Sequence, residues 1–408
     1  MNILFMSLVD IDTINTYGVY TDLLRRFTSQ GDNVYVISPF ERRLSKCECI
    51  IEEHNAKIAK IKILDMQKTN SIEKVISMLT IDKLIIKALK KYFWDVKFDL
   101  VIYPTPPITF VGVVEFVKKR DNARTYLLLK DIFPQNAVDL GMLSKRGIKG
   151  LLYKYFRSKE KKLYAISDYI GCMSQANVDY ILKHNHEINP NVVEICPNAI
   201  DPIDKSIDRK TRNLIRKKYG LPLEKKVFVY GGNLGKPQGI PIFIECIKRC
   251  RQIEDAFFLV VGNGTEYGRL SRYIASSNQK NLKLMKVLPK DDYDILVASC
   301  DVGLIFLDHR FTIPNFPSRL LGYMQAKLPV LACTDPNTDI GQVITDGGFG
   351  WWCESSDTED FHNHVNEIIS LDLSDMKKRS FDFLLEKYSS EKSYKIIQRH
   401  FDDVMENY

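Results

Sequence analysis

The sequence FTIPNFPSRLLGYMQAKLPVL, at residues 311–331, predicts a loop, a helix and the beginning of a strand. Pro317 suits the opening of a helix, where a missing N–H costs nothing, and Ser318 is a residue type that caps helix starts. Leu320, Leu321 and Met324 then recur at helical spacing. Apolar strands are predicted on both sides, at residues 301–307 and 329–333. The helix should therefore open beside the carboxyl end of a buried parallel strand.

The start of this helix is a candidate anion site. Its free N–H groups and its dipole favour a negative charge, and phosphate is the usual anion at such a position. Arg319 is unfavourable for the dipole in the first turn, but it suits a second phosphate ligand. The alternative is an ordinary strand–helix–strand unit with a solvated arginine, and this stretch by itself supports both interpretations.

The length of 408 residues is too great for one core and predicts two domains. The formal net charge of +7 is mild and suits a polyanionic ligand or an anionic membrane surface. The charge is too diffuse to argue for nucleic acid, and no RNA- or DNA-binding signature is present.

The nine cysteines show no CxxC pair and no ligand spacing with histidine, which argues against a structural zinc site. Several, such as Cys172, Cys300 and Cys333, lie in apolar strands, a usage that fits a reducing cytosol. The N-terminal residues predict a first strand and not a signal peptide. No apolar run is long enough to span a bilayer.

Predicted strands and helices alternate along the chain in two series, separated by a linker at residues 197–202. The first series includes a strand at 57–64 and a basic helical region at 71–93, although residues 40–97 are otherwise hard to interpret. The second series starts with a strand at 226–230 and a glycine-rich loop at 231–239. This order predicts two doubly wound α/β domains.

Five segments together resemble glycosyltransferase family 4, whose members are retaining enzymes of the GT-B fold. They are listed here with their residues: KDIFPQNAVDLGML (130–143), PNAID (197–201), VFVYGGNLGKPQG (227–239), FFLVVGNGTE (257–266) and FPSRLLGYMQAKLPVL (316–331). The sequence resembles bacterial transferases that build O-antigen and capsule repeat units.

The resemblance implies two Rossmann-like domains that face a cleft. The first, residues 1–198, would bind the acceptor, and the second, residues 199–385, would bind a nucleotide-sugar donor. Residues 386–408 would form a C-terminal helix that returns to the first domain. GT-B enzymes need no metal at the pyrophosphate, so the resemblance implies no metal and no cofactor.

The resemblance assigns the donor phosphates to the glycine-rich loop and to the start of the helix already described. Glycines allow the backbone to approach a pyrophosphate, and Lys236 adds a charge. Each of these positions also has a purely structural interpretation, as a strand end, a solvated loop residue or a helix packing on a loop. The implied donor-binding residues are Gly18, Gly232, Asn233, Lys236, Gly262, Asn263, Leu288, Asn315, Phe316, Ser318, Arg319 and Leu320.

Two departures from the family pattern concern its Glu-x7-Glu motif. The first glutamate falls on Pro314, and the second, which usually binds the ribose, falls on Gly322. The ribose is then held in another way, or the donor site is weak. In the first domain, Lys130 and Asp131 fall where the family places the residues that face the transferred sugar, which makes them the catalytic candidates. A turn or a helix cap would explain Asp131 equally well.

A basic and apolar segment, SKRGIKGLLYKYFRSKEKKL at residues 144–163, holds eight basic residues and one acidic residue. Such a segment can lie on an anionic membrane, with Lys149, Lys154, Arg157 and Lys161 as its candidate contacts. A surface helix that packs its apolar side on the first domain is the alternative. The acidic residues Asp10 and Asp12 and nearby Asn15 are further candidates for contact with the acceptor.

The resemblance implies a retaining transferase, and the basic segment favours a polyprenyl-pyrophosphate-linked acceptor at a membrane. A UDP-linked N-acetylated amino sugar as the donor is implied by the resemblance alone. The enzyme would act in O-antigen or capsule synthesis. It would be a cytoplasmic protein bound to the inner face of the plasma membrane, and no nucleic acid is expected as a partner. The alternatives are a GT-B nucleotide-sugar epimerase and a catalytically silent partner subunit, which the missing glutamates would suit.

Overall fold

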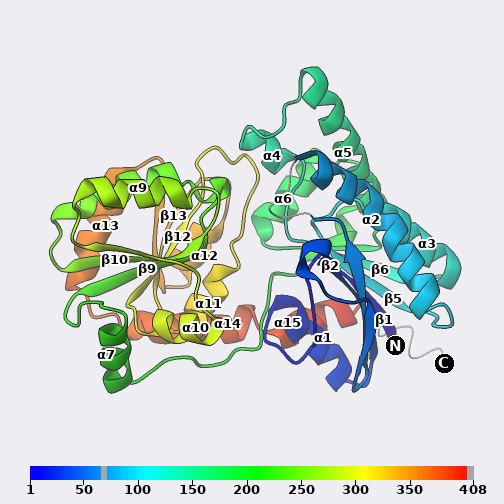
Figure 1. The fold of residues 1–408 in the computed structure, drawn as a ribbon, viewed down its shortest axis with the longest axis horizontal. Helices are drawn as coiled ribbons and strands as arrows, with labels where there is room; N and C mark the ends of the chain where they lie inside the picture. The colour runs from blue at the N-terminus through cyan, green and yellow to red at the C-terminus, as the bar shows by residue number, and fades with distance from the viewer. Residues whose placement is uncertain (66–70, 402–408) are drawn as a thin grey trace. The chain divides into compact units, whose positions relative to one another are not determined.

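The computed structural model describes residues 1–65 and 71–401, apart from the side chains of residues 71–76. The chain divides into two compact units: unit 1 contains Met1–Asp201 and Ser390–Tyr408, and unit 2 contains Pro202–Ser389. Each unit has one sheet with helices packed around it (Figure 1). The structure thus confirms the predicted pair of α/β domains.

In the described part of unit 1, eight strands form a sheet in the order β3-β4-β2-β1-β5-β6-β7-β8. β3 pairs with β4 in antiparallel orientation, and the remaining neighbours pair in parallel. The strands are β1 (Asn2–Met6), β2 (Asn33–Glu41), β3 (Cys49–Glu53), β4 (Ala56–Ile63), β5 (Leu100–Pro104), β6 (Arg124–Leu129), β7 (Tyr169–Cys172) and β8 (Val193–Ile195).

The helices of unit 1 connect these strands, and the last of them comes from the end of the chain. In α15, Ile397 is fully buried in the core that also contains Phe27, and the ring of Tyr394 packs on the ring of Phe27 at 5.0 Å. Residues 402–408 of the expected C-terminal helix lie outside the described residues. The helices are α1 (Val19–Ser29), η1 (Arg42–Leu44), α2 (Ser71–Tyr92), α3 (Val111–Asp121), α4 (Gln135–Asp139), α5 (Gly147–Ile166), α6 (Gln175–His184), η2 (Pro190–Val192) and α15 (Ser390–Gln398).

The sequence analysis missed β3. This strand is at the edge of the sheet, and most of its side chains are exposed or half-buried. It therefore lacks the apolar alternation that marks a half-buried strand. Its position is set by pairing with β4 through a tight turn at Asn55, which has a positive φ of 54°.

In the described part of unit 2, six parallel strands are ordered β11-β10-β9-β12-β13-β14. The chain adds strands outward from β9 in one direction and then starts again at β12 in the other. The switch point of this sheet therefore lies between β9 and β12, which is where open α/β sheets bind ligands. The strands are β9 (Lys226–Asn233), β10 (Ala256–Asn263), β11 (Leu282–Met285), β12 (Val302–Phe306), β13 (Val330–Thr334) and β14 (Gly350–Glu354).

Helices cover both faces of this sheet (Figure 1). α8, α9 and α13 supply Phe243, Leu270 and Phe361 to the core on one face. α10, α11 and α14 lie on the other face. The helices are α7 (Arg209–Lys218), η3 (Lys236–Gln238), α8 (Ile240–Arg249), η4 (Cys250–Gln252), α9 (Tyr267–Ser277), α10 (Lys290–Ala298), α11 (Arg319–Gln325), α12 (Ile340–Asp346), α13 (Thr358–Ser370) and α14 (Ser374–Lys387).

The helix predicted from residues 311–331 is α11, and it is shorter than a typical helix, with seven residues. Ser318 occupies the N-cap position, but its backbone is already helical and its side chain makes no capping hydrogen bond. The prediction of a serine cap was therefore wrong, because a capping side chain needs an extended backbone at this position. Among the described residues, no helix is both long enough and apolar enough to cross a membrane.

Candidate functional site

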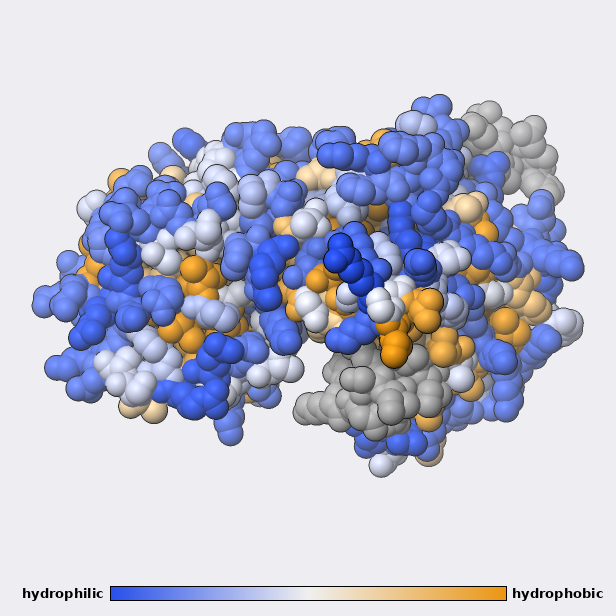
Figure 2. All heavy atoms as spheres, turned by 90° about the horizontal axis from the view of Figure 1, so that it is seen from above, coloured by the Kyte–Doolittle hydropathy of each residue, from blue (hydrophilic) through white to orange (hydrophobic). Residues whose placement is uncertain are grey.

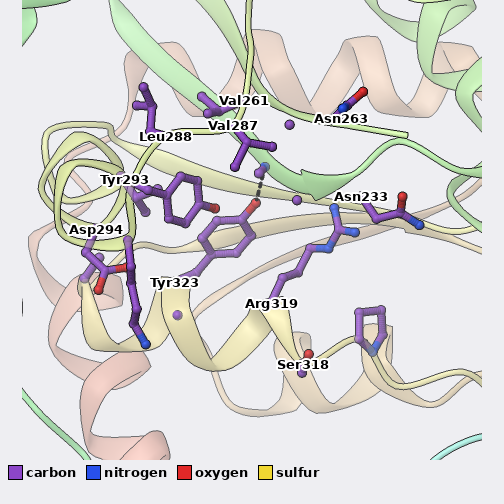
Figure 3. Close-up of a pocket in the computed structure, with 18 of the residues that line it drawn as sticks. Asn233, Val261, Asn263, Val287, Leu288, Tyr293, Asp294, Ser318, Arg319 and Tyr323 are labelled. Carbon is purple, nitrogen blue, oxygen red and sulfur yellow. Dashed lines mark hydrogen bonds between the residues drawn. The ribbon is translucent and has the colours of Figure 1, made fainter. Parts of the chain in front are cut away.

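A cavity of about 740 Å³ lies in unit 2 at the carboxyl ends of the parallel strands. β9 and β10 contribute their last residues, and α10 and the first turn of α11 form other walls (Figure 3). The cavity therefore lies on the β9 side of the switch point. The lining residues are Lys205, Gly231, Gly232, Asn233, Gln238, Val261, Gly262, Asn263, Val287, Leu288, Lys290, Tyr293, Asp294, Val297, Pro317, Ser318, Arg319, Gly322, Tyr323 and Ala326.

Arg319 is the most distinctive of these residues. Its guanidinium lies over the ring of Tyr230, with Cζ 4.3 Å from the ring centroid. Its Nη1 atom is shielded from solvent and has no hydrogen-bond partner, and no carboxylate of the described residues forms an ion pair with it. Figure 3 shows the side chain extending from the start of α11 toward Asn233. A shielded guanidinium N–H group without a hydrogen-bond partner is costly unless an acceptor, such as an anion, completes it.

Two tyrosines hold the sheet and the helices together under the cavity. The hydroxyl of Tyr323 accepts a hydrogen bond from the N–H of Gly231 at 3.1 Å and lies 3.1 Å from the carbonyl oxygens of Val229 and Leu304. The ring of Tyr293 lies so close to Gly231 that a Cβ there would be 1.7 Å from its hydroxyl oxygen. Burial raises the pKa of Tyr293 to about 12, so this phenol is neutral at physiological pH.

The glycines of the cavity have packing roles that the sequence analysis did not anticipate. Gly231 makes room for Tyr293, and a Cβ on Gly262 would lie 1.9 Å from the carbonyl oxygen of Gly232. Gly232 has a φ of +121°, a conformation that other residues rarely adopt. These contacts are between parts of the protein, so they explain the glycines without any ligand.

One end of the cavity is apolar. Val261, Val287 and Leu288 come from the ends of neighbouring strands or from the loop after β11, and Figure 3 shows them together above Tyr293. Arg319 lies away from them, toward Asn233. The cavity thus combines an apolar end with a cationic side, which suits a ligand with a flat apolar group and a negative group.

Seven of the predicted donor-binding residues line this cavity: Gly232, Asn233, Gly262, Asn263, Leu288, Ser318 and Arg319. Five do not. Leu320 is fully buried in the core, and Asn315 accepts a hydrogen bond from Thr338 through its backbone oxygen. Phe316 packs on Tyr388, at a ring-centroid distance of 6.0 Å. Lys236 is exposed in η3 outside the lining, and Gly18 belongs to unit 1.

Tyr293, Asp294 and Lys205 also line the cavity, and the sequence analysis did not identify them. Tyr293 and Asp294 are on α10, and Lys205 follows the linker. No motif surrounds them. The packing of α10 beside α11 brings Tyr293 and Asp294 to the site, and a backbone hydrogen bond to Gln325 of α11 places Lys205 there.

Residues 211–381, which make up most of unit 2, match the model of the family Glycosyl transferases group 1. Unit 2 is thus the domain of a group 1 glycosyltransferase. This glycosyltransferase is 25% identical over 295 residues to "Probable glycosyltransferase WbjE" of Pseudomonas aeruginosa, with 71% of each chain covered. It is also 25% identical over 253 residues, 60% of each chain, to "Putative colanic acid biosynthesis glycosyl transferase WcaI" of Escherichia coli K12. The predicted family and enzyme class are confirmed.

Solved structures confirm the GT-B fold. Sucrose-phosphate synthase from Thermosynechococcus elongatus has a TM-score of 0.76 at 12% identity, with all of both chains covered. HepE from Anabaena in complex with UDP has a TM-score of 0.71 at 14% identity, with 99% of this chain and 100% of HepE covered.

The two catalytic candidates lie in unit 1, directly after β6. Asn136 donates hydrogen bonds to both carboxylate oxygens of Asp131, at 2.8 Å each. Burial raises the pKa of Asp131 to about 6 and lowers the pKa of Lys130 to about 8. The backbone N–H groups of Lys130 and Asp131 both donate to the hydroxyl oxygen of Thr105, which fixes the turn. The carboxylate of Asp131 contacts a side chain of α4 and forms no cap for that helix.

The basic segment at residues 144–163 forms most of α5 and the loop before it. Two of its four predicted membrane contacts already have partners within the protein. Arg157 pairs with Glu160 at 2.6 Å and also donates to Asn185, and Lys161 pairs with Glu187 at 2.9 Å. Lys149 and Lys154 are exposed and form no ion pair with a described residue.

The apolar side chains of the same segment separate into two groups. Phe156 is buried and packs on Phe133, at a ring-centroid distance of 5.1 Å. Ile148 and Leu151 are 89% and 69% exposed, and Tyr155 is exposed as well. These three lie three and four residues apart on one side of α5. Figure 2 views the molecule from the side on which α5 begins and shows hydrophobic side chains among strongly hydrophilic ones.

The candidate acceptor residues of the first loop do not all lie in one place. Asp10 and Asp12 pair with Lys46 and Lys60, and Lys60 is nearly fully buried. Asp10 also lines a second cavity of about 570 Å³, beside the carboxyl ends of β1, β2 and β5, whereas Asn15 lines a different hollow.

Proposed function

We propose that this glycosyltransferase binds a UDP-sugar in the unit 2 cavity and transfers the sugar to a lipid-linked acceptor during synthesis of a surface polysaccharide. The observation that carries the donor assignment is the shielded Nη1 atom of Arg319, which has no partner in a cavity with an apolar end. A nucleoside diphosphate supplies both a base for the apolar end and an anion for the guanidinium.

The chemistry follows from the leaving group. As the bond to the sugar breaks, negative charge grows on the diphosphate, and a fixed cation stabilises that charge without reorganisation. Arg319 offers a planar fork that binds two phosphate oxygens, and stacking on Tyr230 holds the fork in place. The acceptor hydroxyl then attacks the sugar on the face that the diphosphate leaves, so the configuration at the anomeric carbon is retained. The diphosphate accepts the proton of that hydroxyl. This route needs no protein nucleophile.

Asp131 and Lys130 are the proposed catalytic residues of unit 1. Supporting this role, both pKa values are shifted toward neutrality by burial, a feature that is common at catalytic sites. With a pKa of about 6, Asp131 can accept or donate a proton near physiological pH. The transferred sugar is proposed to be an N-acetylated amino sugar, a choice that depends on the family resemblance alone.

The acceptor is proposed to be a polyprenyl-pyrophosphate-linked sugar that unit 1 receives at an anionic membrane. Exposed Ile148 and Leu151 next to Lys149 and Lys154 support this part, because interfacial helices combine apolar insertion with cationic contacts to lipid headgroups. The cavity beside Asp10 is the proposed place for the acceptor. Surface polysaccharide as the product is supported by the name of WcaI, which refers to colanic acid.

Replacing Arg319 tests the donor assignment. Charge-assisted hydrogen bonds contribute roughly 1.5–3 kcal/mol, so Arg319→Ala should weaken UDP binding about ten- to a hundredfold. Uridine, which lacks phosphate, should bind almost as before. Arg319→Lys should weaken UDP binding less than Arg319→Ala does but should not restore the wild-type affinity. Lysine keeps the positive charge but lacks the planar guanidinium that binds two oxygens at once. Calorimetric titration with UDP and uridine measures both effects, and Arg272→Ala, at an exposed position on α9, is the control.

Equal losses for UDP and uridine would show that Arg319 supports the fold and not the phosphates. No UDP binding by the wild-type protein would contradict the donor assignment. Product analysis with UDP-sugars completes the test, since conversion of one free sugar nucleotide into another would indicate an epimerase.

A further inference from the structure

Part of the cavity wall is open where α11 passes beneath it. Gly322 lines the cavity, and a Cβ built on this glycine meets nothing within 4 Å. One carboxylate lines the same cavity in the described part of unit 2, and it belongs to Asp294 on α10. Figure 3 shows Tyr293 and Tyr323 between Asp294 and Arg319. The open space over Gly322 and the carboxylate of Asp294 therefore both face the cavity, and Asp294 lies away from the guanidinium of Arg319.

Asp294 is held by a lysine that is itself fixed to α11. Its Oδ2 atom lies 2.7 Å from Nζ of Lys205, and the backbone N–H of Lys205 donates to the carbonyl oxygen of Gln325 at 2.8 Å. Both side chains are largely covered, with 22% and 26% exposed for Lys205 and Asp294. Among the described residues, none donates a hydrogen bond to Oδ1 of Asp294, so this oxygen is available to a ligand.

The chemistry of the proposed donor indicates what this oxygen would meet. In the proposed function, Arg319 binds the diphosphate, and the apolar residues Val261 and Leu288 contact the base. Between base and diphosphate, a ribonucleotide carries the two hydroxyls of its ribose. A carboxylate accepts hydrogen bonds from such hydroxyls well, because its oxygens are acceptors only.

We propose that Asp294, positioned by Lys205, binds the ribose hydroxyls of the nucleotide and makes the site selective for ribonucleotides. This proposal depends on the proposed function, since it assigns a further part of the same ligand. Asp294 reaches the ligand from α10, and the open space over Gly322 leaves room for the ribose. Lys205 acts through Asp294 as a positioning residue.

The test compares UDP with 2′,3′-dideoxy-UDP, which lacks both hydroxyls. The wild-type protein should bind UDP at least tenfold more tightly than the dideoxy compound in calorimetric titrations. Asp294→Ala should remove most of this preference. Both ligands carry the same diphosphate, so the ratio of their affinities cancels any effect of leaving Lys205 unpaired. Asp294→Asn, which keeps the shape, should retain an intermediate preference.

Two further variants separate a ribose contact from a general loss of structure. Asp291→Ala, at an exposed position on the same helix, should keep the wild-type preference. Gly322→Glu in the Asp294→Ala background places a carboxylate in the open space and should restore the preference at least in part. Thermal unfolding of each variant shows whether it is folded.

Equal affinity of the wild-type protein for UDP and the dideoxy compound would overturn this proposal and leave the donor assignment intact. This proposal would also fail, with the donor assignment intact, if Asp294→Ala lowers the affinity for UDP and for the dideoxy compound by the same factor, because the preference would then be kept. If the wild-type protein binds no UDP at all, the proposed function fails, and this inference fails with it.

Discussion

Arg319 and Asp131 illustrate at the residue scale how burial changes what a side chain can do. Arg319 keeps its charge in every environment, so shielding it without a carboxylate leaves a strong demand for an anion. Asp131 can lose its charge instead, and burial raises its pKa to about 6. The first residue therefore indicates a ligand, and the second indicates proton chemistry.

The raised pKa of Asp131 predicts a pH-dependent stability. The folded state binds the proton of Asp131 more tightly than the unfolded state, whose pKa is near 3.8. Asp131 therefore lowers the free energy of unfolding as the pH rises from about 4 through about 6. Asp131→Asn should be more stable than the wild-type protein at pH 7.5, by up to about 3 kcal/mol, with no gain near pH 4. Denaturant unfolding at both pH values measures the difference.

The matched control for this prediction is Asp179→Asn, at an exposed position on α6 in the same unit. It should change stability equally at both pH values. Of these two variants, only Asp131→Asn should lower turnover, because Asp131 is a proposed catalytic residue and Asp179 is not. A stability gain that is the same at pH 4 and pH 7.5 would show that Asp131 is charged throughout.

At the element scale, α5 carries two different surfaces. Phe156 and Leu163 pack into unit 1, whereas Ile148 and Leu151 face outward near the start of the helix. Arg157 and Lys161 are bound to Glu160 and Glu187. The cations that remain for another partner are therefore toward the N-terminal half of the helix, where the exposed apolar residues also lie.

Charge reversal at the start of α5 should release the protein from anionic vesicles. Each basic residue near such a surface contributes about 1 kcal/mol, so Lys149→Glu with Lys154→Glu should weaken binding at least tenfold. Binding should also weaken as salt rises. Sedimentation with phosphatidylglycerol vesicles, compared with phosphatidylcholine vesicles, measures the effect.

Lys119→Glu with Lys183→Glu changes the net charge by the same amount at exposed positions of unit 1 and should have little effect. If the wild-type protein does not bind anionic vesicles at low salt, α5 is an ordinary surface helix and the membrane prediction is wrong. Equal losses for the two double variants would show that only net charge matters.

At the scale of the whole molecule, the chain forms unit 1 from both of its ends. Ile397 and Phe401 lie in the unit 1 core, while the cavity around Arg319 is lined entirely by residues of unit 2. The stability of unit 1 therefore depends on the C-terminal segment, and the donor cavity does not.

Ile397→Ala tests this separation. Removing a fully buried isoleucine side chain costs about 2–4 kcal/mol, so unit 1 should unfold at lower denaturant concentration. The affinity of unit 2 for UDP should stay the same below the transition. Lys395→Ala, on the exposed side of α15, should change neither property. A parallel loss of UDP affinity in Ile397→Ala would show that the two units are energetically coupled.

The sequence by itself determined the two α/β domains, the family and the position of Arg319, because these depend on local patterns. Buried parallel strands are continuous apolar runs, and a glycine-rich loop and a helix start are contiguous in the chain. The tertiary structure decided the rest of the site. Tyr293 and Asp294 reach the cavity only because α10 packs beside α11, and Arg157 and Lys161 have partners only because α5 folds next to residues 185–187. Contacts between distant segments, and the burial that shifts the pKa of Asp131, arise from packing and leave no pattern of spacing in the sequence.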